Sequence, residues 1–151
     1  MKFNADMAIY DKTGQLALVV EVKNKQDTSS SWAARMRRNM LAHGLMPITR
    51  FFLLALPDRF YLWKDAGIAP EIVPPDYEID PRPFLRSYYN GAEISPGSLT
   101  GESFELVISS WLNKLLQNNV LPPELQEQDW LTESGLFEAI RLGHLAAQVA
   151  V

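Results

Sequence analysis

Residues 16–25, LALVVEVKNK, constrain the fold more than any other stretch of this chain. Leu16 to Val20 is an unbroken apolar run, which is typical of a strand that is buried on both faces of a sheet. Two charged side chains, Glu21 and Lys23, follow at the end of that run. Because side chains alternate across a strand, these two share one face. A carboxylate and an ammonium group at the end of a central strand indicate a functional site at that end of the strand.

A preceding strand is expected at residues 6–11, DMAIYD, followed by a turn, DKTG, in which Gly14 suits a positive φ. Together with residues 16–23 it predicts a β-hairpin. A two-residue loop places Asp6 either directly opposite Glu21 or diagonal to it, on the same face. A three-residue loop sends Asp6 to the other face unless a bulge intervenes.

The remaining elements are predicted from periodicity and turn residues. Residues 28–43 predict a helix with hydroxyl N-cap residues at its start and Gly44 at its end. Two strands, 50–57 and 59–64, predict a second hairpin whose first strand is central in the sheet. Residues 65–83 hold five of the ten prolines and predict an ordered loop. Further helices are expected at 83–90, 101–118 and 133–148.

This order predicts a mixed α and β chain, with one domain over residues 1–151 and a central mixed sheet flanked by helices. Its core is expected at about 5–64, and extra C-terminal helices are expected at about 83–151. The aromatic residues Tyr61, Trp63 and Trp111 are interpreted as core residues.

Composition excludes several classes of site. The chain has no cysteine, which excludes disulfides, thiolate zinc sites and a cysteine nucleophile. Two histidines, His43 and His144, are too few for a His-rich metal site. No apolar run approaches the roughly 18 residues of a membrane span, and the N-terminus does not read as a signal peptide, so a cytoplasmic location without a membrane partner is expected. The net charge of -4 argues against coating nucleic acid through bulk charge, but not against a local basic patch.

Asp6, Glu21 and Lys23 together indicate metal-assisted chemistry. Two close carboxylates raise one pKa unless a cation lies between them. Oxygen ligands suit Mg²⁺ or Mn²⁺, and Mg²⁺ needs only one or two carboxylates besides waters and phosphate oxygens. Such an ion polarises a phosphodiester and activates water, while Lys23 orients or deprotonates that water or stabilises charge at phosphorus. The competing interpretation is a solvated ion pair at a sheet edge, with Asp6 bonding its own backbone.

The pattern of Asp6 and, fifteen residues later, Glu21-Val22-Lys23 resembles the motif of the PD-(D/E)XK nuclease superfamily, which has the restriction-endonuclease-like fold. In that family the Glu-x-Lys strand ends a hairpin, and a helix and two more strands follow. Residues 5–64 match this order. The resemblance implies a nuclease that hydrolyses DNA with Mg²⁺ or Mn²⁺, in which Asp6 and Glu21 bind the metal and Lys23 is the catalytic lysine.

Four further residues are candidate DNA contacts. Arg35 and Arg38 lie three residues apart on the helix after the motif and share a face. Lys25 lies two residues after Lys23, so in an extended chain both point to the same side, and Gln26 is expected near the start of that helix. Arg37, by contrast, is expected on a solvated helical face.

The family's fold normally begins with a helix that often supplies another acidic ligand, whereas five residues precede Asp6 here. A partner protein that supplies this helix, or a homodimer, is therefore a candidate assembly. The alternative function is a catalytically inactive nuclease-fold subunit that mediates interactions in a larger complex. The acidic net charge favours that alternative, and the intact Asp/Glu/Lys set favours the enzyme.

Overall fold

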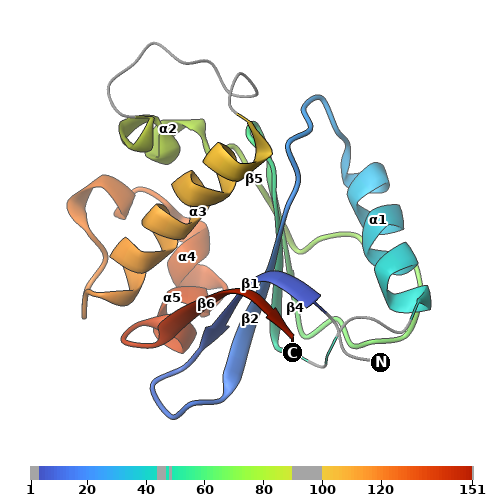
Figure 1. Cartoon of the computed structure of the whole chain (residues 1–151), viewed down its shortest axis with the longest axis horizontal. Coiled ribbons are helices and arrows are strands. Elements are labelled where there is room, and N and C mark those ends of the chain that lie inside the picture. Colours follow the sequence, from blue (N-terminus) through green and yellow to red (C-terminus); the bar gives the residue numbers. More distant parts are fainter. Residues whose placement is uncertain (1–3, 44–46, 48, 90–99, 151) are drawn as a thin grey trace.

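The computed structural model describes residues 4–43, 47, 49–89 and 100–150 (Figure 1). A six-stranded mixed sheet, with strand order β5-β4-β3-β2-β1-β6, forms its centre. The strands are β1 (Asn4–Tyr10), β2 (Leu16–Val22), β3 (Phe51–Ala55), β4 (Phe60–Lys64), β5 (Tyr77–Ile79) and β6 (His144–Ala150). The helices are α1 (Ser30–Ala42), α2 (Arg82–Leu85), α3 (Gly101–Leu116), α4 (Asp129–Glu133) and α5 (Leu136–Ile140), with 3₁₀ turns at Arg86–Tyr88 and Pro123–Leu125. The predicted mixed α and β class is therefore confirmed.

The first two strands form an antiparallel hairpin, and α1 then carries the chain across to β3, which is parallel to β2. A parallel pair needs such a crossover because the chain must return to the same end of the sheet. β3 and β4 form a second antiparallel hairpin. All five residues of β3 are buried between β2 and β4, which confirms the predicted central position of this strand.

Helices cover both faces of the sheet: α1 lies on one side, and α2 to α5 lie on the other (Figure 1). The core on the α3 side is centred on Trp111, whose ring stacks on Phe84 with centroids 5.1 Å apart. The core on the α1 side is smaller and includes Tyr61 and Trp63, while Met36 of α1 packs at its border. The predicted core positions of Tyr61, Trp63 and Trp111 are thus confirmed.

The predicted C-terminal helix at 133–148 is wrong. The helical segments there are short, α5 ends at Ile140, and residues 144–150 form β6 along the outer edge of β1. The extended backbone of Arg141, with a ψ of 139°, ends the helix. Leu142 then has a φ of +64°, and Gly143 passes close to the backbone of Tyr10. Pairing with β6 satisfies backbone N–H and C=O groups of β1 that would otherwise lie unpaired at a sheet edge. This pairing is a long-range interaction, so the local helical periodicity of residues 133–148 cannot predict it.

Two further boundaries differ from prediction. The proline-rich segment 65–83 contains the short edge strand β5, which pairs with β4. The helix predicted at 83–90 is a single turn, α2, followed by the 3₁₀ turn Arg86–Tyr88. The predicted stop at Asn90-Gly91 and the predicted cap at Gly44 lie outside the described residues.

Candidate functional site

The hairpin brings Asp6 to Glu21 through a bulge. Residues 7 to 9 of β1 pair in regular register with residues 20 to 18 of β2, but Tyr10 pairs with Leu16, so the register shifts by one residue. The loop has three residues, 12–14, closed where the Asp11 N–H donates to the Gln15 carbonyl at 2.7 Å. Of the alternatives that the sequence left open, the structure therefore has the three-residue loop with a bulge. The bulge compensates for the extra loop residue and returns Asp6 to the position opposite Glu21.

The two carboxylates are hydrogen-bonded to each other's strands. The Asp6 N–H donates to Glu21 Oε1 at 3.3 Å, and the Val22 N–H donates to Asp6 Oδ2 at 2.8 Å. Ala5 contributes to the α1-side core and Met7 to the opposite core, so the normal alternation is interrupted at Asp6. This irregularity lets the Asp6 carboxylate turn toward β2.

Glu21 is buried, with 7% of its surface exposed. Burial, and then the neighbouring charge of Asp6, raise the pKa of Glu21 to about 8, while Lys23 acts weakly in the opposite direction. Without a cation, Glu21 is therefore mostly protonated at neutral pH. The half-buried Lys23 follows directly, and its N–H donates to the Ala55 carbonyl at 3.0 Å, which extends the β2–β3 pairing beyond Val22.

Helix α3 brings two more acidic residues to Asp6. A pocket of 290 Å³ is lined by Asp6 and Met7 of β1, Glu102, Glu105, Leu106 and Ser109 of α3, and Ala147 and Gln148 of β6. Glu105 Oε2 accepts a hydrogen bond from Gln148 Nε2 at 3.3 Å. Burial raises the pKa of Glu105, and the charges of Asp6 and Glu102 add to this effect.

Sequence reasoning missed Glu105 because it lies 99 positions from Asp6 along the chain. The available signal was weak: Glu102 and Glu105 fall on one face of the predicted helix, beside its apolar stripe. Within the described ranges, no group of three or more histidine, aspartate and glutamate residues has the arrangement of a metal site. Asp6 and Glu21 are the two acidic residues that the hairpin brings together.

The loop between β2 and α1 carries Lys25 and Gln26, and both side chains are exposed. Gln26 does not begin the helix, because α1 starts at Ser30. The loop is anchored where the Asp27 N–H donates to Asp58 Oδ2 at 3.1 Å. Asp58, in the turn between β3 and β4, therefore fixes the position of this loop.

Two other contacts fix the same loop. The hydroxyl groups of Thr28 and Tyr61 are hydrogen-bonded at 2.8 Å. Ser29 caps α1, since its hydroxyl accepts from the Trp32 N–H at 3.1 Å. Lys25 Nζ lies 5.8 Å from the centre of the Trp32 ring, a cation–π contact. The chain after Lys23 is therefore held at several points.

The arginines of α1 divide into two groups. Arg35 is exposed and Arg38 is half-buried, and neither forms a hydrogen bond or ion pair with Asp6, Glu21 or Lys23. Arg37 is buried, so its predicted solvated position is wrong.

Arg37 is buried because it reaches across the α1 side of the sheet. Its Nη2 donates to the Gly67 carbonyl at 2.7 Å, and its guanidinium lies 5.9 Å from the centre of the Trp63 ring. Among the described residues, its Nε and Nη1 atoms have no hydrogen-bond partner. Arg37 therefore ties the segment after β4 to α1 instead of facing solvent.

Comparisons with known proteins place this chain in no family. No protein-family model matches it, and no curated protein and no solved structure matches it significantly. Across the described segments, no helix is both long and apolar enough to cross a membrane. The functional proposal therefore rests on the geometry of Asp6, Glu21 and Lys23.

Proposed function

We propose that this protein is a divalent-metal-dependent nuclease of the PD-(D/E)XK type that hydrolyses phosphodiester bonds in DNA. The observation that carries the proposal is the pairing of Asp6 and Glu21 at one end of the β1–β2 hairpin, with Lys23 next on the same strand. The hairpin, the α1 crossover and the parallel strand β3 support a restriction-endonuclease-like core around this site.

The donor atoms suit Mg²⁺ or Mn²⁺. Asp6 and Glu21 offer carboxylate oxygens, and the pKa of Glu21 is raised first by burial and then by the neighbouring charge of Asp6, which a bound cation would offset. Binding of a divalent ion would release the proton from Glu21. Two carboxylates satisfy Mg²⁺, which keeps several waters and accepts phosphate oxygens. When bound, the ion would act as a Lewis acid toward the phosphodiester.

Other residues of the chain support these two ligands. Lys23 is held beside Glu21 by the bond from its N–H to Ala55, so its ammonium group can orient the attacking water or stabilise charge on the phosphoryl oxygens. The Val22 N–H fixes the orientation of the Asp6 carboxylate. Glu105, in the pocket shared with Asp6, adds negative charge that favours a cation.

DNA contacts are proposed on the segment that follows Lys23. Lys25 and Gln26 are exposed on a loop whose conformation is anchored by Asp58. Arg35 and Arg38 of α1 are the further candidates for binding the phosphate backbone. A partner protein or a second copy of the chain remains a candidate for completing the DNA-binding surface, because the net charge of the chain is -4.

A catalytically inactive interaction subunit is the second candidate function, and one observation favours it. Both carboxylates already have partners without a metal: Asp6 accepts from the Val22 N–H, and the raised pKa of Glu21 keeps it mostly neutral. A buried, protonated Glu21 that is hydrogen-bonded to the neighbouring strand is stable in a structural role.

The test is cleavage of supercoiled plasmid and of single-stranded DNA with Mg²⁺ or Mn²⁺. Wild type is compared with Asp6→Ala, Lys23→Ala and the control Lys114→Gln, which changes an exposed lysine on α3 that pairs with Glu124. We expect metal-dependent cutting that falls by about 100-fold or more in Asp6→Ala and Lys23→Ala and is unchanged in the control.

Metal binding distinguishes the proposed role of Asp6 as a metal ligand from the proposed role of Lys23 in catalysis. Mn²⁺ should raise the melting temperature of wild type and Lys23→Ala but not of Asp6→Ala, because only the last loses a ligand. Folded wild type that cuts with neither metal would favour the interaction subunit. Equal cleavage by Lys23→Ala and wild type would remove Lys23 from the mechanism.

A further inference from the structure

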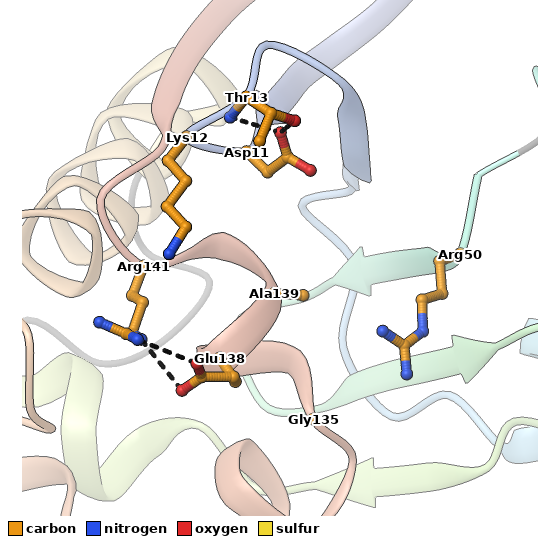
Figure 2. A pocket seen from close by; sticks show the side chains of 8 residues that line it. All are labelled: Asp11, Lys12, Thr13, Arg50, Gly135, Glu138, Ala139 and Arg141. Atoms are coloured by element: carbon orange, nitrogen blue, oxygen red, sulfur yellow. Dashed lines mark hydrogen bonds and ion pairs between the residues drawn. The ribbon is translucent and has the colours of Figure 1, made fainter.

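A second pocket lies at the opposite end of β2 from Glu21, beside the hairpin loop (Figure 2). Its volume is 320 Å³, and it is lined by Asp11, Lys12, Thr13, Arg50, Gly135, Glu138, Ala139 and Arg141. These residues come from the β1–β2 loop, the start of β3 and the α5 region. The Lys12 and Arg50 side chains lie on opposite sides of Ala139 (Figure 2).

Cationic groups surround this space. Besides Lys12, the Arg50 guanidinium and the Lys64 ammonium approach Gly135 together. A Cβ atom built on Gly135 would lie 3.8 Å from Arg50 Nη2 and 3.9 Å from Lys64 Nζ. Across the described residues, neither Lys12 nor Lys64 forms a hydrogen bond or ion pair through its ammonium group. The charge of Lys12 interacts with the Glu138 carboxylate at longer range.

The acidic residues nearby are already satisfied. Asp11 Oδ1 accepts from the Thr13 hydroxyl at 2.5 Å, from the Gln15 N–H at 3.0 Å and from the Thr13 N–H at 2.9 Å. The hydroxyl bond first, and then the backbone bonds, lower the pKa of Asp11. Glu138 is held by two bonds from Arg141, Nε to Oε2 at 3.0 Å and Nη2 to Oε1 at 2.9 Å.

Arg50 has one weak acidic neighbour. Its Nε lies 3.8 Å from Asp65 Oδ1, and both side chains are more than half exposed, so solvent screens this pair. The terminal nitrogens of Arg50 therefore remain available as donors, together with the ammonium groups of Lys12 and Lys64.

We infer that this pocket binds a phosphate group. A tetrahedral oxyanion accepts several charge-assisted hydrogen bonds at once, and Arg50 offers a planar pair of donors while Lys12 and Lys64 offer ammonium groups. The volume suits inorganic phosphate or a small phosphate-bearing molecule. This inference does not depend on the proposed nuclease function, because no residue of the pocket belongs to the Asp6–Glu21–Lys23 site.

The test is titration of the full chain with inorganic phosphate at constant ionic strength, followed by amide chemical shifts. We expect saturable shifts at Gly135 and Ala139, and an affinity that falls by about tenfold in Lys12→Gln and in Arg50→Gln. The control Lys114→Gln removes an exposed lysine of α3 that does not line the pocket, and it should bind phosphate like wild type. A parallel titration with a deoxynucleoside monophosphate identifies the source of the phosphate: tighter binding assigns a nucleotide, and equal binding assigns the free anion.

A further variant separates a pocket from diffuse surface charge. Ala139→Leu places a larger side chain in the pocket and leaves Lys12, Arg50 and Lys64 unchanged. Phosphate binding should therefore be lost, while the amide spectrum remains that of a folded protein. Shifts that do not saturate at millimolar phosphate would overturn the inference. An equal loss of affinity in Lys114→Gln, or unchanged binding in Ala139→Leu, would also overturn it.

Discussion

Glu21 and Arg37 are the acidic and basic side chains that are buried within the described part of the chain. Burial shifts both pKa values toward the neutral form, upward for Glu21 and downward for Arg37. Each residue also keeps only part of its hydrogen-bonding capacity, with Arg37 Nε and Nη1 left without partners. Burying these two ionisable side chains costs free energy, so both residues give predictions about the stability of the fold that can be tested without an enzyme assay.

Glu21 should make stability depend on pH. Its pKa rises from 4.5 to about 8 on folding, so the folded state binds the proton more tightly than the unfolded state does. Its contribution is therefore fully present below pH 4.5 and is lost as the pH rises through about 8. In this window wild type should lose about 1.4 kcal/mol of unfolding free energy per pH unit relative to Glu21→Gln. Urea denaturation across these pH values measures the difference, and parallel profiles for the two proteins would contradict the shift.

Arg37 should tolerate an apolar replacement of similar size better than truncation. Arg37→Met keeps most of the contact with Trp63 and removes a poorly satisfied buried cation, so it should change the unfolding free energy by less than about 1 kcal/mol. Arg37→Ala leaves a cavity and should cost about 2–4 kcal/mol. Equilibrium denaturation of both variants tests this order. A larger loss in Arg37→Met would show that the bond to the Gly67 carbonyl dominates.

At the scale of elements, the strand β6 completes the surroundings of the candidate site. It pairs with β1 on the side away from β2, and its Gln148 lines the pocket that contains Asp6. The register places Gln148 opposite Asp6, and Gln148 has a φ of +51°. The hairpin residue Asp6 is thus flanked by irregular backbone, which is a recurrent feature of functional positions.

The turn into β6 should depend on Gly143. A Cβ at this position would lie 2.2 Å from the Tyr10 carbonyl oxygen and 2.9 Å from that of Ile140. Both are backbone atoms, so Gly143→Ala should displace the start of β6 and cost about 2 kcal/mol or more. The control is Gly101→Ala, since no atom lies within 4 Å of its added Cβ. Thermal unfolding of both variants tests this, and equal melting temperatures would contradict the close approach.

At the scale of the whole molecule, the sheet order gives β1 a neighbour on each side and leaves β5 and β6 at the edges. The strand that carries Asp6 is therefore held between the hairpin partner and the C-terminal strand. Since α3 packs on the same side as α4 and α5 (Figure 1), the candidate site combines segments from the beginning and the end of the described chain.

Removal of residues 144–151 should therefore loosen β1. The backbone hydrogen bonds that β6 makes contribute about 1 kcal/mol each, and the truncated chain would expose β1 as a new edge. We expect a lower urea midpoint and faster amide hydrogen exchange in β1 than in β3, compared with a control chain that ends at residue 150. Unchanged protection of β1 amides in the truncated chain would show that β6 does not support this strand.

Much of the sheet could be predicted from sequence because its signals are local. The apolar run Leu16–Val20, the glycine at position 14 and the helix after it specify a hairpin and a crossover within a short stretch. Alternation along the strand also predicts that Glu21 and Lys23 share a face. The exact loop length could not be predicted, because a bulge at Tyr10 changes the register without leaving a clear mark in the sequence.

The sequence by itself determined the mixed α and β class, the hairpin with its charged end, and the central place of β3. The tertiary structure alone decided that residues 144–150 form a strand, that Glu105 lines a pocket with Asp6, that Arg37 is buried and that Arg50 and Lys12 line one pocket. The physical reason is the range of the interactions. Turn chemistry and side-chain alternation act over a few residues, whereas strand pairing at a free edge and burial of a long cation depend on which distant segment supplies the partner.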